Sequence, residues 1–465
     1  MSNQKSTNKH PQYKYASTRE KYCFGIGAIG KDAICNLVGS FLMLYFTDTL
    51  YLAPAFVGVL FLVARIWDAI NDPVMGMICD NTHTKFGKFR IWLVIGTLLN
   101  SVAFVLLFHS FHLSGTSLYI YVSVMYILYG MTYTIMDVPY WSWLPNLTND
   151  PHERESVSVI PRFFASLAGF SIGVFGLSMI NGMDKIFGNG DRTAGFRMVA
   201  LVISILFVFT ISVTIVNVKE KVTEKAAEHT SFKQIINILF KNKQLIAYIG
   251  LLLAYNLCMQ IVNGIIIYYF KYVAGKEGLF SIFSVCILAE MGGLVVFPKI
   301  VKKLGREKMF AMACTFPIIG LIIIAVAGFV APTNPLFVIL GAGILKLGSG
   351  FELGVVTVCI ADVIDYNELL FGTRNESIIC STQTFLMKAS QAVSGLLTGV
   401  GLAMVGYNAS LPQQSTATLN GIRIIMIVIP MVFAVISYLI YAKAYKLKGD
   451  YLNNMVKELN VVHEA

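Results

Sequence analysis

Long apolar runs, separated by short charged or polar segments, follow one another along almost the whole chain. Each is about 20 residues or longer, the length that a helix needs to cross a hydrocarbon core about 30 Å thick. They predict twelve membrane-spanning helices over residues 22–50, 54–79, 89–111, 117–146, 158–182, 197–218, 244–273, 278–300, 308–331, 334–364, 377–405 and 421–447. We therefore expect an all-α polytopic membrane protein.

Composition excludes a soluble domain of this length. Of 465 residues, 56% are hydrophobic and 13% are charged, against roughly 45–50% and 25% in soluble domains. The eight cysteines lie in or beside apolar runs without C-x-x-C spacing, which favours small apolar side chains over metal ligands or disulfides. The polar first 20 or so residues lack the apolar core of a cleaved signal peptide, so the first span is expected to direct insertion.

Positive charge alternates between loops and gives the expected orientation. Lys and Arg gather in segments 85–90, 219–243 and 299–308, whereas 51–54, 332–334 and 406–420 carry almost none. Because cytoplasmic loops are rich in Lys and Arg, and the number of spans is even, both termini are predicted to be cytoplasmic. The net charge of +10 thus reflects orientation in a lipid bilayer, and no nucleic-acid partner is expected.

The polar segment between the sixth and seventh spans divides the chain into two halves. The predicted parts are a cytoplasmic tail, a six-helix bundle, a central loop, a second six-helix bundle and a second tail, over residues 1–21, 22–218, 219–243, 244–448 and 449–465. A basic turn centred on Gly87 has a counterpart at Gly305, between the second and third spans of each half. This repetition is typical of the major facilitator fold. The central loop is a candidate site for a cytoplasmic regulator, although a plain solvated loop is favoured.

Two carboxylates share one face of the second span, where an ionised group costs roughly 2.5–3.5 kcal/mol and needs a partner or a function. Asp68 and Asp72 are four residues apart, with Asn71 on the same flank. They repel each other unless a cation lies between them. The spacing predicts an oxygen-ligand pocket for Na⁺, with Asp68 and Asp72 as ligands, or for a proton. The alternative is an ion pair between Asp68 and Arg65.

A second polar face lies on the fourth span. The spacing of Thr134, Asp137 and Trp141 places a hydroxyl, a carboxylate and an indole on one side of the helix. A carboxylate accepts hydrogen bonds from sugar hydroxyls, and an indole stacks on the apolar face of a sugar ring. This face therefore suits a sugar. Lys31 and Asp32 of the first span have similarly apolar surroundings.

The other intramembrane charges complete the predicted set. The negative charges exceed the positive ones by one, because Asp32, Asp68, Asp72 and Asp137 are set against Lys31, Arg162 and Lys388. A bound cation would neutralise this excess. Arg65 and Glu352 would change the balance. Gln383 and Thr384 precede Lys388 and offer further polar contacts, although such residues more often join helices. A gating ion-pair network is predicted near a cytoplasmic helix end, where Asp362 and Asp365 have Arg374 and Glu376 close by, and Arg65 is assigned to gating as well.

The chain resembles the glycoside–pentoside–hexuronide:cation symporter family of the major facilitator superfamily. The resemblance runs from about Gly25 to Tyr451 and is most specific at Gly30-Lys31-Asp32, at 61–73, at 130–137 and at 161–170. It implies a cation site for Na⁺, Li⁺ or H⁺ formed by Asp68, Asn71, Asp72 and Thr134. It implies a galactosyl site formed by Asp32 and Asp137, assisted by Lys31, Tyr133, Trp141, Arg162, Gln383, Thr384 and Lys388.

Some positions depart from that family's sugar carrier. Gly39 and Leu353 replace two pocket aromatics, a tyrosine and a tryptophan, so the end of the pocket away from Asp32 and Asp137 is expected to be wider or reshaped. Glu290, Lys346 and Glu352 lack charged counterparts and allow an extra ion pair or simply lie at helix ends.

The expected function is cation-coupled sugar uptake by alternating access, without covalent chemistry or a cofactor. A different glycoside, a pentoside or a glucuronide is the first alternative, because Arg162 and Lys388 suit a carboxylate. A lysolipid transporter is disfavoured by the polar pocket. A membrane-embedded glycosyltransferase or hydrolase would use paired Asp residues as acid and base, but the short loops leave no room for a substrate domain.

Overall fold

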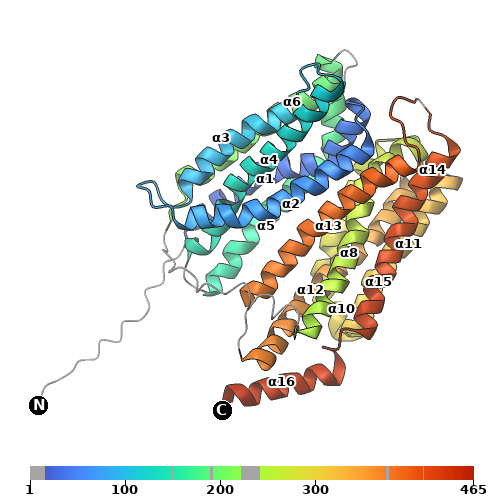
Figure 1. Cartoon of the computed structure of the whole chain (residues 1–465). Helices are drawn as coiled ribbons and strands as arrows, with labels where there is room; N and C mark the ends of the chain where they lie inside the picture. The colour runs from blue at the N-terminus through green and yellow to red at the C-terminus, as the bar shows by residue number, and fades with distance from the viewer. Residues whose placement is uncertain are drawn as a thin grey trace, which may run out of the picture. The chain divides into compact units, whose positions relative to one another are not determined.

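A computed structural model describes residues 16–148, 151–188, 192–220, 241–372, 376–411 and 413–464, and every regular element in these ranges is a helix (Figure 1). In the first half of the sequence these elements are α1 (Thr18–Leu44) with a π-helical turn η1 (Tyr45–Thr49), α2 (Pro54–Asp80), α3 (Arg90–Leu107), α4 (Gly115–Trp143) with a 3₁₀ turn η2 (Leu144–Leu147), α5 (Pro151–Phe187) and α6 (Arg192–Asn217).

The second half repeats the pattern of long helices with irregular ends. Its elements are α8 (Lys243–Tyr268) with a π-helical turn η3 (Tyr269–Val273), α9 (Leu279–Val285), α10 (Ile287–Leu304), α11 (Arg306–Val330), α12 (Pro335–Phe371), α13 (Glu376–Met404), α14 (Thr416–Arg423) with a π-helical turn η4 (Ile424–Val428), α15 (Ile429–Lys443) and α16 (Gly449–Glu464).

The expected all-helical, multi-pass character is confirmed. Within the described residues, eleven helical stretches are long and apolar enough to cross a membrane. The predicted eleventh span, 377–405, corresponds to α13, which is helical throughout but is not among these eleven. Two features were not predicted: the eighth span divides at Cys286 into α9 and α10, and the C-terminal tail contains the helix α16.

The chain forms two compact units, which do not coincide with the two halves of the sequence. The first comprises Met1–Val38, Trp67–Ile172 and Gly182–Glu228, and the second comprises Gly39–Ile66, Gly173–Asn181 and His229–Ala465. The last part of α1, the turn η1 and the first part of α2 therefore group with the helices of the second half. The bundle boundaries expected from the sequence stay a prediction.

Buried polar side chains join the helices of the first unit. Asn100 of α3 donates from Nδ2 to the carbonyl of Tyr129 and to Oγ1 of Thr132, both in α4 and both at 3.0 Å. Thr214 of α6 donates to the carbonyl of Cys23 in α1 at 2.8 Å. A buried donor without an acceptor costs free energy, so these contacts fix how α1, α3, α4 and α6 pack.

Equivalent buried contacts join the helices of the second unit. The hydroxyl of Ser437 in α15 donates to the carbonyl of Leu251 in α8 at 2.8 Å. The phenol of Tyr255 in α8 donates to the carbonyl of Ala313 in α11 at 3.3 Å. Apolar side chains fill the surrounding space, as expected for helices that are apolar on most faces.

The first basic turn is held by a carboxylate from the start of the central segment. Glu220 accepts the backbone N–H groups of Lys88, Phe89 and Arg90 at 2.8, 2.9 and 3.3 Å. The N-terminal N–H groups of a helix lack intrahelical partners and favour a negative charge. Glu220 thus caps α3 from a distant part of the chain. Gly87 precedes these donors with a φ of +106°, a left-handed conformation that glycine adopts without a steric penalty.

Candidate functional site

The predicted cation ligands of α2 lie against α4 in the first unit. Thr134 donates from Oγ1 to Oδ1 of Asp72 at 2.9 Å. Asn71 has a buried Nδ2 for which the described residues provide no hydrogen-bond acceptor. A carboxylate of α2 and a hydroxyl of α4 are therefore in direct contact, and Asn71 immediately precedes that carboxylate along α2. Oxygen ligands of this kind suit Na⁺, Li⁺ or a proton.

Gly130 allows the other carboxylate of this cluster to approach α4. A Cβ atom at Gly130 would lie 2.9 Å from Oδ1 of Asp68, closer than real Cβ contacts allow. Asp68 and Asp72 are one turn apart on α2, and Gly130 and Thr134 are one turn apart on α4. The two carboxylates thus lie against α4 one turn apart.

A second cluster, also in the first unit, forms around Lys31 of α1. Its Nζ lies 2.8 Å from Oδ1 of Asp137 in α4 and 3.2 Å from Oδ2 of Asp32. The Lys31 side chain is 2% exposed, whereas those of Asp32 and Asp137 are 19% and 26% exposed. Two carboxylates share one buried ammonium and keep part of their surface open. Such partly exposed carboxylates can accept hydrogen bonds from the hydroxyls of a ligand.

Aromatic rings surround the same ammonium. Lys31 Nζ lies 4.9 Å from the ring centre of Trp141, 5.4 Å from that of Tyr140 and 5.9 Å from that of Tyr133. A cation this close to ring faces is attracted by about 0.5–2 kcal/mol per ring. The phenol of Tyr140 is anchored by donating to the carbonyl of Phe24 at 2.6 Å. The structure therefore brings together Lys31 with the four predicted sugar-site residues Asp32, Tyr133, Asp137 and Trp141.

The remaining predicted sugar-site residues lie elsewhere on the chain. Arg162 lies on an exposed face of α5 in the first unit. Gln383 and Lys388 are half-buried on α13 in the second unit, and the side chain of Thr384 lies outside the described part. Their participation stays a prediction.

The predicted gating residues are found on two helices. Asp362 of α12 pairs with Arg306 at the start of α11, with Nη1 and Oδ2 2.7 Å apart. Asp365 is half-buried one turn further along α12, and Arg65 is half-buried on α2. Arg374 lies outside the described residues. The described partner of Asp362 is therefore Arg306, which the sequence reasoning had assigned to the basic turn.

The second unit also contains the three charged residues that lack charged counterparts in the family that the chain resembles, Glu290, Lys346 and Glu352. Lys346 of α12 pairs with Glu290 of α10 at 3.2 Å. Glu352, two turns beyond Lys346, is 5% exposed, and its Oε1 has no hydrogen-bond partner among the described residues. The expected extra ion pair is thus present between Glu290 and Lys346.

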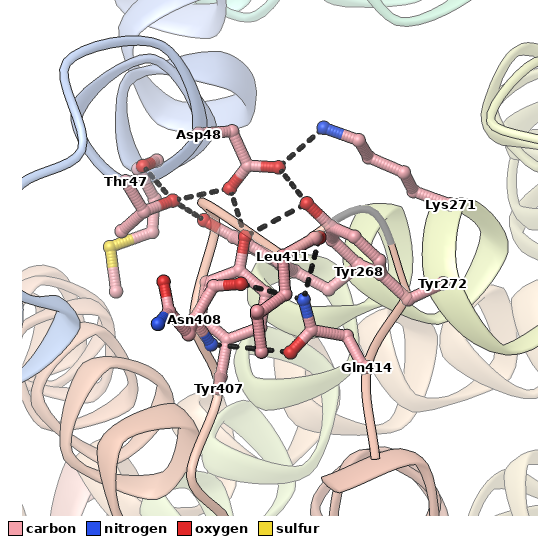
Figure 2. Close-up of polar contacts among 10 residues, drawn as sticks. Thr47, Asp48, Tyr268, Lys271, Tyr272, Tyr407, Asn408, Leu411 and Gln414 are labelled. Carbon is pink, nitrogen blue, oxygen red and sulfur yellow. Dashed lines mark hydrogen bonds and ion pairs between the residues drawn. The ribbon is translucent and has the colours of Figure 1, made fainter. Parts of the chain in front are cut away.

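Sequence reasoning missed Asp48, whose carboxylate accepts hydrogen bonds from four side chains of the second unit. Figure 2 shows its carboxylate between side chains from the ends of α1 and α8 and from the segment after α13. Asp48 lies at the end of the first predicted span and is not among the site residues predicted from the sequence. The sequence offered one signal, because Tyr-Phe occurs at 45–46 and again at 269–270, in the first helix of each half.

Comparison with known families gives a match over most of the chain. A family model described as "MFS/sugar transport protein" matches residues 23–449. The nucleoside transporter NupG has a similar fold, with a TM-score of 0.66 and 12% identity, covering 92% of this chain and 100% of that one. The fold is therefore that of the major facilitator transporters, and neither the relatives nor these neighbours are enzymes.

Several curated relatives are similar over most of their length. The isoprimeverose transporter of Lactiplantibacillus pentosus is 30% identical over 89% of this chain and 85% of its own. The "Putative glycoside/cation symporter YagG" of Escherichia coli strain K12 is 30% identical over 96% of this chain and 95% of its own. The lactose permease of Lactobacillus helveticus is 25% identical over 94% of this chain and 71% of its own.

Proposed function

Because the chain belongs to the MFS/sugar transport protein family, we propose that it couples the uptake of a glycoside to the entry of a monovalent cation by alternating access. One observation carries the coupling. Along a single stretch of α4, Gly130 and Thr134 contact the carboxylates of α2, while Asp137 contacts Lys31 of α1. A small movement of α4 therefore affects both clusters at once.

The cation part of the proposal rests on Asp68, Asn71, Asp72 and Thr134. These residues supply hard oxygen atoms and two negative charges without a metal-binding His or Cys. Na⁺, Li⁺ or H⁺ would reduce the repulsion between the carboxylates, and its entry would supply about 2.3 kcal/mol per charge for every 100 mV of membrane potential. The name of the relative YagG, a glycoside/cation symporter, agrees with cation coupling.

The sugar part of the proposal rests on the cluster around Lys31. Asp32 and Asp137 would accept hydrogen bonds from sugar hydroxyls, and Trp141 would stack on the ring. Lys31 holds both carboxylates in position by sharing its ammonium between them. We propose a galactoside that resembles melibiose. The relative named lactose permease favours a galactoside, whereas the isoprimeverose transporter favours a pentose-containing glycoside as the second candidate.

Gly39 and Leu353 would determine the choice between these sugars. A Cβ atom at Gly39 would have no neighbour within 4 Å, so this part of α1 leaves open space. Leu353 of α12 is 38% exposed. Both positions carry pocket aromatics in the sugar carrier that the chain resembles, so we propose that the loss of these rings changes which sugar is accepted. Arg162 and Lys388 would instead favour a glucuronide if they contact the ligand.

Coupling then follows from thermodynamic linkage. If the cation raises the affinity for the sugar by some factor, the sugar raises the affinity for the cation by the same factor. Thr134 donates a hydrogen bond to Asp72, and Asp137 follows Thr134 by three residues on α4, so a change at the cation cluster would reach the sugar cluster through one turn of helix. Neither the binding of the cation nor the binding of the sugar forms or breaks a covalent bond.

The proposed setting is the bacterial inner membrane with both termini in the cytoplasm and one six-helix bundle on each side of the central loop. Arg65, Asp362, Asp365 and Arg374 would belong to the cytoplasmic gate, and a regulator would act through the central loop.

The test is uptake of labelled melibiose, lactose and isoprimeverose into membrane vesicles, with Na⁺, Li⁺ or only H⁺ supplied. We expect a cation gradient to drive accumulation of at least one of these sugars without chemical change. Competition by a glucuronide tests the alternative ligand. If no glycoside accumulates or competes under any of the three ion conditions, the proposed function is wrong.

A further inference from the structure

The carboxylate of Asp48 is buried among four donors. Oδ1 accepts from Thr47 Oγ1 at 2.7 Å and from Tyr407 Oη at 2.5 Å. Oδ2 accepts from Lys271 Nζ at 2.5 Å and from Tyr272 Oη at 2.6 Å. The Asp48 side chain is 1% exposed. All of these residues belong to the second unit, and Figure 2 shows that their side chains converge on the one carboxylate.

Two of the three contributing segments are equivalent positions of the two halves. Asp48 lies in the π-helical turn that ends α1, and Lys271 and Tyr272 lie in the π-helical turn that ends α8. A Tyr-Phe pair begins at Tyr45 and again at Tyr269. Asp48 is three residues after the first of these tyrosines, and Tyr272 is three residues after the second. The backbone repeats as well, because Leu50 donates to the carbonyl of Tyr45 at 3.0 Å, as Ala274 does to that of Tyr269. The repeat thus carries an acid in one half and donors in the other.

The third segment is braced so that it presents Tyr407. The side chain of Gln414 donates to the carbonyl of Asn408 at 2.7 Å and accepts the backbone N–H of the same residue at 3.2 Å. Burial, and then the charge of Asp48, raise the pKa of Tyr407, so its hydroxyl remains a donor at neutral pH. Tyr407 also lies 3.0 Å from the hydroxyl of Tyr272.

The hydrogen bonds of Asp48 stabilise the arrangement strongly while they are formed, but the transfer of all their partners into water together costs little free energy. A hydrogen bond to a charged group contributes about 1.5–3 kcal/mol, and removal of one partner leaves a buried charge unpaired. Full separation of the segments, however, would let water solvate Asp48, Lys271 and the phenols together. An interaction with these properties suits a contact that forms in one state and dissolves in another.

We propose that Asp48 is a releasable clasp: its carboxylate holds together the end of α1, the end of α8 and the segment after α13 in one state of the transport cycle, and releases them in the other. This inference rests on the proposed function, since alternating access requires the two halves to part at one end and then at the other. The end of α1 and the segment after α13 adjoin loops 51–54 and 406–420, which carry almost no positive charge, and the alternation of the predicted spans assigns the end of α8 to the same side. The clasp would therefore close the outer end.

The test measures opening without any sugar or cation. A cysteine replaces Gly39, where a Cβ atom has no neighbour within 4 Å, in a protein whose native cysteines have been replaced. Gly39 precedes Asp48 by nine residues, which corresponds to about 14 Å along the helix axis. In right-side-out vesicles, a membrane-impermeant maleimide added outside reports how often the cysteine becomes accessible. We expect Asp48→Asn and Lys271→Met to raise the labelling rate at least tenfold.

Matched controls separate the clasp from general loosening of the protein. Lys276→Met and Tyr51→Phe change exposed residues near the same helix ends and should leave the labelling rate unchanged. Tyr407→Phe removes a single hydroxyl from the clasp, so it tests the proposal even if Asp48→Asn does not fold; it should raise the rate severalfold. Unchanged labelling in every folded clasp variant would overturn the proposal. Because labelling needs no substrate, failure of the uptake experiment would leave this result intact.

Discussion

The replacement Gly130→Ala tests whether the contact between α2 and α4 forms the cation site. The new Cβ would lie 2.9 Å from Oδ1 of Asp68, whereas ordinary contacts begin near 3.4 Å. The carboxylate must therefore move by roughly half an ångström or rotate away from its rotamer, which costs about 0.5–1.5 kcal/mol. Since 1.36 kcal/mol corresponds to a factor of ten, we expect the affinity for the coupling cation to fall by about 2- to 12-fold.

The assay is the concentration of the stimulating cation that gives half-maximal sugar counterflow. Alanine favours a helix more than glycine does by about 1 kcal/mol, so the replacement should not weaken α4 itself. Gly76→Ala on α2 is the matched control, because a Cβ atom there has no neighbour within 4 Å. Linkage adds an internal check, since the apparent sugar affinity should fall at low cation concentration and recover at saturation.

Two results would refute the reasoning. If Gly130→Ala and Gly76→Ala need the same cation concentration for half-maximal counterflow, the position of Asp68 against α4 does not contribute to the cation site. If sugar affinity falls equally at low and saturating cation, the contact acts on the sugar cluster directly.

Three further replacements test the other contacts. Asp72→Cys should abolish cation-driven accumulation but leave measurable sugar binding, because the carboxylate is lost while the cluster around Lys31 is intact; full accumulation in vesicles would contradict the cation site. Lys31→Met should lower the free energy of unfolding by about 3–5 kcal/mol, because two carboxylates lose their buried partner. Adding Asp137→Asn should recover part of the lost melting temperature. If the effects of the two replacements on stability are strictly additive, the ion pair does not matter. Glu220→Ala should destabilise by about 1–3 kcal/mol by uncapping α3, whereas the exposed Glu458→Ala should not, and equal melting temperatures would exclude the cap.

Several features of the site followed from local spacing. A helix repeats every 3.6 residues, so Asp68 and Asp72 necessarily share a face, as do Thr134, Asp137 and Trp141. Burial of charge in a membrane is costly whatever the fold. The sequence could therefore single out these side chains as functional, but it could not say which residue of α4 each carboxylate of α2 would meet.

Other features depended on neighbours far away along the chain. Glu220 caps α3 across more than 120 residues, and Asp48 meets Tyr407 across 359. Glu220 has no distinctive local pattern, and the repeated Tyr-Phe pair near Asp48 does not identify its partners. The π-helical turns that hold Asp48 and Lys271 also appear only in three dimensions, because a single extra residue in a helix leaves the apolar pattern almost unchanged.

The sequence by itself determined that the chain is all-helical and crosses the membrane many times, because the transfer of each apolar segment of about 20 residues into lipid is a local property. The tertiary structure alone decided that Thr134 binds Asp72, that Lys31 joins Asp137, and that Asp48 collects donors from three segments. Those contacts depend on the packing of whole helices against one another, and no short stretch of sequence contains that information.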